Sequence, residues 1–325
     1  MKNYTVKTYN SEDFTLWNEF ILRANNATFL FHRDFMDYHS DRFLDYSLLV
    51  FQGENLVTIL PANRVEDMVF SHQGLTYGGF VFESNIKLGQ VLSIVKEVLK
   101  YLNNYNIKTL KLKRIPSIYT SFFSEEIEYA MFLTEAKLIR RDCLSVLDLT
   151  MDYKISKTRR ESIHRGKKNE LEIREESDFK LFWEEILIPN LDKKHSAKPV
   201  HSFQEMELLH QKFPYNIRHF NVYYMGKIVA GTTVFVTDNV AHPQYISGNS
   251  QKNGLGSIDY LYHYLITEVF KDKHYFDFGP SHENNGKQIN QGILFWKESF
   301  GAKTTVQDWY EVETEDYIKL ENILI

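Results

Sequence analysis

The 325-residue sequence contains one cysteine, seven prolines and only 15 glycines. A single cysteine, Cys143, excludes an internal disulfide framework and a zinc site built from cysteines, and it fits a reducing compartment. No apolar run reaches 18 residues, and the opening MKNYTVKTYNSEDF has no apolar segment of the kind that signal peptides carry. We therefore expect a cytoplasmic protein without a membrane span.

An excess of positive charge is also lacking. Lysine and arginine number 38 against 43 aspartates and glutamates, so the formal net charge is -5. This balance gives no support to a nonspecific grip on nucleic acid, and we expect neither a nucleic-acid partner nor a bound metal. Hydrophobic residues make up 43% of the chain and charged residues 25%, as in an ordinary soluble globular protein. At this length two domains of about 150 residues are expected.

Two parts of the sequence repeat the same order of elements, at an offset of roughly 170 residues. Each begins with two β-rich runs around a glycine turn, at Gly53 and at Gly226, which is typical of a β-hairpin. A further strand pattern, a helix pattern and a last strand follow in both parts. The repeat predicts two α/β domains, residues 1–152 and 153–325, each with a mixed, mostly antiparallel sheet flanked by helices.

The few glycines gather at one place, where a strand pattern ends near Gly248 and a helix pattern begins at Ser257. Between them lies the string Q-x-x-G-x-G, from Gln251 to Gly256. A helix start presents unpaired N–H groups and partial positive charge, and residues without a Cβ let a phosphate approach closely. The string predicts a diphosphate cradle, with a plain strand-to-helix turn as the alternative. The expected cradle residues are Ser247, Gly248, Gln251, Asn253, Gly254, Leu255, Gly256 and Ser257.

The order hairpin, strand, Q-x-x-G-x-G, helix, strand resembles that of the GNAT acyltransferases, in which the string binds the pyrophosphate of coenzyme A. The segments HYFDFGPS and KESFGA resemble those of the Fem-type transferases, which are tandem GNAT folds. The resemblance implies two tandem GNAT-like domains, with the acyl-CoA site in 153–325 and the substrate side in 1–152. Fem enzymes take an amino acid from aminoacyl-tRNA and generally lack the coenzyme A string. The chain is therefore more similar to tandem GNAT sugar N-acyltransferases, which act on dTDP-linked amino sugars for surface polysaccharides.

The reaction that this resemblance implies is direct attack of an amino-sugar amine on the thioester of acyl-CoA. The departing thiolate needs positive charge or a proton, and the resemblance to Fem enzymes places Lys297 there; a surface lysine is the alternative. His242 is a candidate base, because a neutral imidazole accepts a proton near neutral pH, unless water takes the proton. Asp277 either orients the amine or is a paired structural carboxylate.

Three further residues are candidates for contact with the diphosphate of a nucleotide sugar. His39 and Arg42 lie beside an aromatic-rich N-terminal stretch, and Arg159 lies in the basic stretch 151–169, which is either a solvated connecting helix or a cationic wall facing phosphates. Two other classes stay open. One is an aminoacyl-tRNA-dependent Fem-type transferase that builds peptidoglycan peptides, and the other is a noncatalytic binding protein whose glycine string is only a turn.

Overall fold

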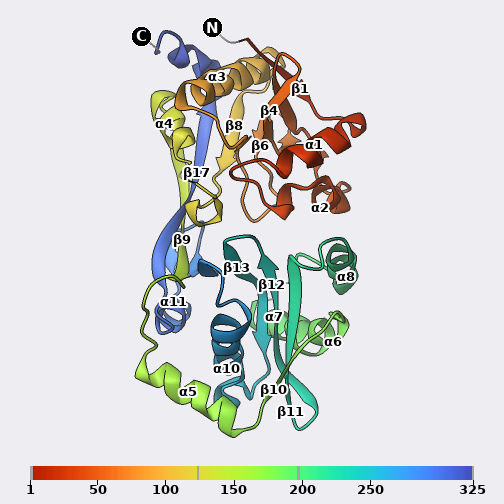
Figure 1. Cartoon of the computed structure of the whole chain (residues 1–325), viewed down its shortest axis with the longest axis vertical. Coiled ribbons are helices and arrows are strands. Elements are labelled where there is room, and N and C mark those ends of the chain that lie inside the picture. Colours follow the sequence, from red (N-terminus) through yellow and green to blue (C-terminus); the bar gives the residue numbers. More distant parts are fainter. Residues whose placement is uncertain (1–2, 123, 196–197, 324–325) are drawn as a thin grey trace. The chain divides into compact units, whose positions relative to one another are not determined.

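The computed structural model describes residues 3–122, 124–195 and 198–323 (Figure 1). The chain forms two compact units: unit 1 is Met1–Asp142 with Val306–Ile325, and unit 2 is Cys143–Thr305. Strand β17 (Lys303–Glu313) pairs antiparallel with β8 (Thr109–Lys113) and so carries the end of the chain into unit 1. The units therefore differ from a division of the chain at residue 152, because the last residues fold with the first ones.

Unit 1 contains two rows of paired strands. Its other strands are β1 (Tyr4–Thr8), β2 (Leu44–Asp45), β3 (Leu48–Gln52), β4 (Asn55–Leu60), β5 (Asn63–Val65), β6 (Met68–Phe70) and β7 (Val81–Phe82). The rows run β1-β3-β4-β7 and β17-β8-β6-β5-β2. Pairing is antiparallel except between β6 and β8. The α-helices are α1 (Phe14–Ile21), α2 (Arg33–Met36), α3 (Leu88–Asn104) and α4 (Glu126–Leu133).

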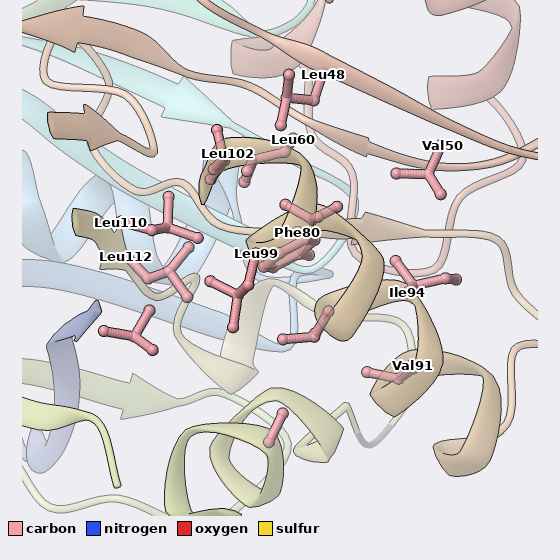
Figure 2. Packing of buried hydrophobic residues seen from close by; sticks show 14 of the residues in the cluster. Leu48, Val50, Leu60, Phe80, Val91, Ile94, Leu99, Leu102, Leu110 and Leu112 are labelled. Atoms are coloured by element: carbon pink, nitrogen blue, oxygen red, sulfur yellow. The ribbon is translucent and has the colours of Figure 1, made fainter. Parts of the chain in front are cut away.

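Helix α3 supplies one wall of the core of unit 1. Its apolar residues recur every three or four positions, so one face of the helix is apolar and is buried. Figure 2 shows this face among residues of the surrounding strands. The side chains labelled there are Leu48, Val50, Leu60, Phe80, Val91, Ile94, Leu99, Leu102, Leu110 and Leu112. All of them are almost completely buried.

Unit 2 contains one row of strands in the order β10-β11-β12-β13-β14-β9. The bounds are β9 (Lys137–Asp148), β10 (Glu172–Glu175), β11 (Ile217–Tyr224), β12 (Lys227–Val236), β13 (Val240–Gly248) and β14 (Tyr275–Pro280), with a small separate hairpin of β15 (His282–Glu283) and β16 (Gln288–Ile289). Only β13 and β14 are parallel. The sequence predicts a mixed, mostly antiparallel sheet flanked by helices. This fold class is confirmed.

The helices of unit 2 lie between its strands in the sequence. They are α5 (Lys157–Lys168), α6 (Lys180–Phe182), α7 (Ile188–His195), α8 (Phe203–Lys212), α9 (Lys252–Leu255), α10 (Ser257–Tyr264) and α11 (Gln291–Glu298). A π-helical turn, Trp183–Leu187, joins α6 to α7, and a second one, Leu265–Val269, extends α10. Helix α10 packs its buried residues Leu261 and Tyr262 against the sheet core. Within the described part of the chain, every helix is too short or too polar to cross a bilayer.

Candidate functional site

Strands β13 and β14 separate soon after they meet. They pair in parallel at Val240–Tyr275 and Ala241–Phe276 only. Both strands are irregular just beyond this point: β13 has a bulge against β12 after Pro243, and β14 has one against β9 after Asp277. Bulges bend a strand and turn its side chains in new directions. His242 and Asp277 are the first residues beyond the paired part.

His242 and Asp277 contact each other there. Nδ1 of His242 lies 3.2 Å from Oδ2 of Asp277 and 3.0 Å from the backbone oxygen of the same residue. The other carboxylate oxygen accepts a hydrogen bond of 2.8 Å from the N–H of Gly279. Because Nδ1 faces two oxygen acceptors, it carries the hydrogen, and Nε2 is the nitrogen left to accept a proton. The carboxylate is thus paired, as one of the two readings of Asp277 expects.

Lys297 of α11 lies close to the same strand end. Its side chain is buried, with 5% of the residue exposed, and Nζ donates to the backbone oxygens of Gly279 (2.8 Å) and Pro280 (2.6 Å). Burial lowers the pKa of Lys297 to about 8, although the negative charge of Asp277 acts in the opposite direction. The alternative of a surface lysine is wrong. On the same helix the apolar residue Ile293 is exposed instead.

The glycine string does not form an open loop in this structure. Its residues form the short helix α9, in which the N–H groups of Leu255 and Gly256 donate to the backbone oxygens of Gln251 and Lys252. Gly254 is exposed, and a Cβ added there would meet no atom within 4 Å. The strand, turn, helix and strand order that the sequence predicts for this region is confirmed.

Gly256 is explained by a helix contact. It has a φ of +70°, and a Cβ on it would lie 2.2 Å from the backbone oxygen of Ser162 in α5. Gly166, one turn further along α5, lies against Tyr260 of α10 and the backbone oxygen of Gly256 in the same way. The start of α10 is therefore covered by α5, and Ser257 there is fully buried. A glycine within a basic helix is the sequence signal that could have revealed this contact.

Polar contacts fix α5 over the string. Nη2 of Arg165 lies 3.4 Å from the backbone oxygen of Asn253, and Nδ2 of Asn169 donates to that of Leu255. At the other end of the string, Asn190 of α7 donates to Oγ of Ser247 (2.7 Å) and to the oxygen of Gly248 (2.9 Å). Sequence reasoning missed Asn190.

Sequence reasoning also missed a buried contact between Tyr245 of β13 and His201, which precedes α8. The hydroxyl of Tyr245 lies 2.5 Å from Nδ1 of His201, and the N–H of His201 donates to the same hydroxyl. The indole of Trp183 donates to the backbone oxygen of His201 (3.0 Å). No spacing in the sequence joins these residues, because they come from three separate segments.

The three candidates for diphosphate binding occupy different surroundings. In unit 1, His39 is 2% exposed and stacks on Tyr38 with ring centroids 4.3 Å apart, and burial lowers the pKa of the imidazole. Arg42, also in unit 1, is exposed. In unit 2, Arg159 forms an ion pair with Asp259. Whether any of them binds a ligand stays a prediction. Among the residues that the structure describes, no group of three His, Cys, Asp or Glu side chains could hold a metal ion.

Unit 1 also contains one parallel pair of strands, β6 with β8, which corresponds to β13 with β14 in unit 2. In unit 1 the residues that follow these strands pack together beyond the paired part. Ser71 follows β6, and its Oγ accepts a hydrogen bond from the N–H of Lys113. The N–H of Gly78 donates to the oxygen of Lys113, and a Cβ on Gly78 would lie 1.5 Å from the oxygen of Ser71. Backbone therefore lies where unit 2 has its His242–Asp277 pair.

Comparison with known proteins finds chains of similar structure but none of similar sequence. The chain matches no protein-family model and no curated protein sequence. It is similar in structure to FemX, with a TM-score of 0.68 at 7% identity over 98% of this chain and 99% of that one. It is also similar to L-PGS from Bacillus licheniformis, with a TM-score of 0.62 at 13% identity over 97% and 95% of the two chains.

A third similar structure is the C-terminal domain of a putative lysylphosphatidylglycerol synthetase from Agrobacterium fabrum. Its TM-score is 0.61 at 11% identity, over 96% of this chain and 95% of that one. At such identities the likeness shows the fold alone. The predicted resemblance to Fem-type proteins is thus confirmed at the level of the fold.

Proposed function

We propose that the chain is an N-acyltransferase that moves an acyl group from a thioester directly to an amine. The observation that carries the proposal is the convergence of His242, Asp277 and Lys297 at the point where β13 and β14 separate. The fold shared with FemX supports it. A buried lysine with a lowered pKa next to a carboxylate-bound histidine is the kind of arrangement found at catalytic sites.

In the proposed reaction the amine nitrogen attacks the thioester carbon, and its proton passes to Nε2 of His242. Asp277 holds the imidazole by Nδ1 and stabilises the imidazolium that forms. The C–S bond then breaks, and the leaving thiolate takes up the proton that His242 accepted, directly or through solvent, which returns the imidazole to its neutral form. Lys297 supplies positive charge near the departing sulfur. Because Nζ already donates to two carbonyl oxygens, its position is fixed before substrate arrives.

The proposed donor is acyl-CoA. Because α5 covers Gly256 and Ser257, the diphosphate would be held by the exposed part of the string, Asn253 and Gly254, together with Arg165, which lies beside them. Exposed backbone N–H groups and a guanidinium are both good partners of phosphate. The proposed acceptor is an amino-sugar nucleotide, such as a dTDP-linked sugar of surface polysaccharide synthesis in the cytoplasm, with Arg42 as a candidate for its diphosphate.

A second candidate is an aminoacyl-tRNA-dependent transferase of the Fem type, and one observation favours it. The outer side of α5 carries Lys157, Arg160, Lys167 and Lys168, which are all exposed. In the described part of the chain none of these four cations has an ion-pair partner. Such a row of cations suits an RNA backbone.

Thermal unfolding with each donor separates the two candidates, because a ligand that binds the folded state raises Tm. We expect millimolar coenzyme A to raise Tm of the wild-type protein. Gly254→Asp should remove that shift by placing a carboxylate beside the diphosphate, whereas the neutral Gly254→Asn should keep it. A protein whose Tm responds to tRNA but not to coenzyme A is the Fem-type transferase, and the acyl-CoA proposal is then wrong.

A further inference from the structure

Helix α11 carries Lys297 and packs on the core of unit 2 chiefly through one aromatic residue, Trp296. Lys297 is the one buried residue of Gln291–Glu298, and the outward residues Ile293 and Phe295 are 45% and 62% exposed. Trp296 packs edge-on against Tyr262 and Phe278, with ring centroids 5.1 and 5.7 Å apart. A helix of eight residues is marginal unless other parts of the protein hold it. The position of Nζ therefore depends on what holds Trp296 and the end of the helix.

An ion pair between α5 and α10 provides two such contacts. Arg159 and Asp259 form a close pair, with side chains 11% and 12% exposed. Asp259 accepts a hydrogen bond of 2.7 Å from the indole N–H of Trp296, and Arg159 donates one of 2.8 Å to Oγ of Ser299. The two contacted residues stand on either side of Lys297 in the sequence.

Further contacts within the protein support the Arg159–Asp259 ion pair. Oγ of Ser299, which accepts from Arg159, donates in turn to the backbone oxygen of Trp296 (2.6 Å). The guanidinium of Arg159 lies 5.3 Å from the ring centroid of Phe300. Buried charges are tolerated when they are paired and hydrogen-bonded, and removing one partner leaves the other charge uncompensated. The arrangement thus acts as a unit that joins α5, α10 and α11.

We propose that the Arg159–Asp259 ion pair is the positioning element of Lys297: it fixes Trp296 and Ser299 and so holds Nζ on the backbone oxygens of Gly279 and Pro280. Arg159 then acts through Lys297 and does not touch substrate. The proposal deepens the proposed function and rests on it for the part that Lys297 plays in transfer. The placement of Lys297 itself does not depend on that function.

The direct test measures the ionisation of Lys297 by NMR of protein whose lysines carry ¹³C at Cε, which leaves the N–H groups of Nζ intact, with Lys297→Gln to identify the signal. The titratable groups that act on the pKa of Lys297 are Asp277 and Cys143, and both raise it. In the wild type we expect the signal to titrate near pH 8. In Arg159→Met we expect the midpoint to rise by about one unit or more, toward the 10.5 of a solvated lysine, because Nζ is released to water. Arg159→Lys should restore part of the change.

Arg33→Met is the matched control. Arg33 is a buried arginine of unit 1 that is paired with Asp37 and Asp45, so its loss also destabilises the protein. Arg33 belongs to unit 1 whereas α11 belongs to unit 2, so the substitution should leave the titration of Lys297 unchanged. If Arg159→Met does not fold, Asp259→Asn, which keeps an acceptor for Trp296, serves instead.

The outcomes separate the two proposals. A raised midpoint in Arg159→Met but not in Arg33→Met supports the positioning role, even if the protein transfers no acyl group under any condition. With an active protein we also expect kcat of Arg159→Met to fall tenfold or more with little change in KM. An unchanged midpoint in folded Arg159→Met overturns the positioning role and leaves the proposed function standing.

Discussion

Gly166 and Gly256 lie against each other where α5 crosses the start of α10. A Cβ on Gly256 would lie 3.1 Å from the backbone N of Gly166, and a Cβ on Gly166 would lie 3.1 Å from the backbone oxygen of Gly256. The absence of two side chains therefore brings two helices together. This contact gives Gly256 a role in stability that is separate from any ligand.

Two substitutions in the same string should consequently have opposite effects. Gly256→Ala should lower the free energy of unfolding by about 2–4 kcal/mol, because it combines a positive φ with overlap on the backbone of α5. Gly254→Ala should be neutral or stabilise by up to about 1 kcal/mol, because it meets open space and Ala favours helix. Urea unfolding of both variants measures the difference. Equal stabilities would show that α5 does not lie against Gly256.

A buried histidine of unit 2 should make stability depend on pH. His219 is fully buried, with Nδ1 2.9 Å from Oγ1 of Thr233 and Nε2 3.1 Å from Oδ1 of Asn221. Nδ2 of Asn221 donates to Glu176, so its oxygen faces the imidazole, and Nε2 carries the hydrogen. The ring is surrounded by Phe179, Phe182 and Trp183. This environment has no place for a charged imidazolium.

Burial lowers the pKa of His219 from 6.5 to about 4. The unfolded chain therefore binds the proton at a higher pH than the folded one does, and stability should fall as pH drops from 6.5 to 4. The loss from this group is on the order of 3 kcal/mol. His219→Gln should flatten the dependence in this window, while His164→Gln, which changes an exposed histidine of α5, should not. Urea midpoints between pH 4 and 7 measure both slopes.

The ionisation of Lys297 should determine how kcat falls at alkaline pH. Its pKa of about 8 means that it loses its charge just above neutral pH, since burial disfavours the ammonium. If the charged form stabilises the leaving thiolate, kcat should fall as pH rises through 8. Lys297→Met should lower kcat by about 10²–10³ and remove this fall with pH. Glu298→Gln, which changes the exposed neighbour, should leave the pH profile as in the wild type.

The sequence predicts those strands, turns and helices well that depend on a single short-range pattern. The hairpins around Gly53 and Gly226 and the helix that begins at Ser257 are all present, because turn glycines and apolar periodicity act over short distances. Lys297 was found through a family resemblance, and its burial could not be read from its helix, in which neighbouring apolar residues are exposed.

Contacts between distant segments could not be predicted. Arg159 is paired with Asp259, a carboxylate one hundred residues further along the chain, and no local pattern in the sequence connects the two. The cover of α5 over α10 and the return of β17 to unit 1 likewise depend on pairings that leave no local periodicity. The helix that covers the glycine string carries basic residues, which by themselves indicate only a solvated or an anion-binding face.

The most direct test of the account is the rate at which coenzyme A thiol is released from acetyl-CoA in the presence of a dTDP-linked amino sugar. We predict release that requires the amine and that falls by about 10²–10⁴ in His242→Gln and in Asp277→Asn, with Tm close to that of the wild type. Amine-dependent release at an unchanged rate in both variants would contradict the claim that acyl transfer takes place where β13 and β14 separate.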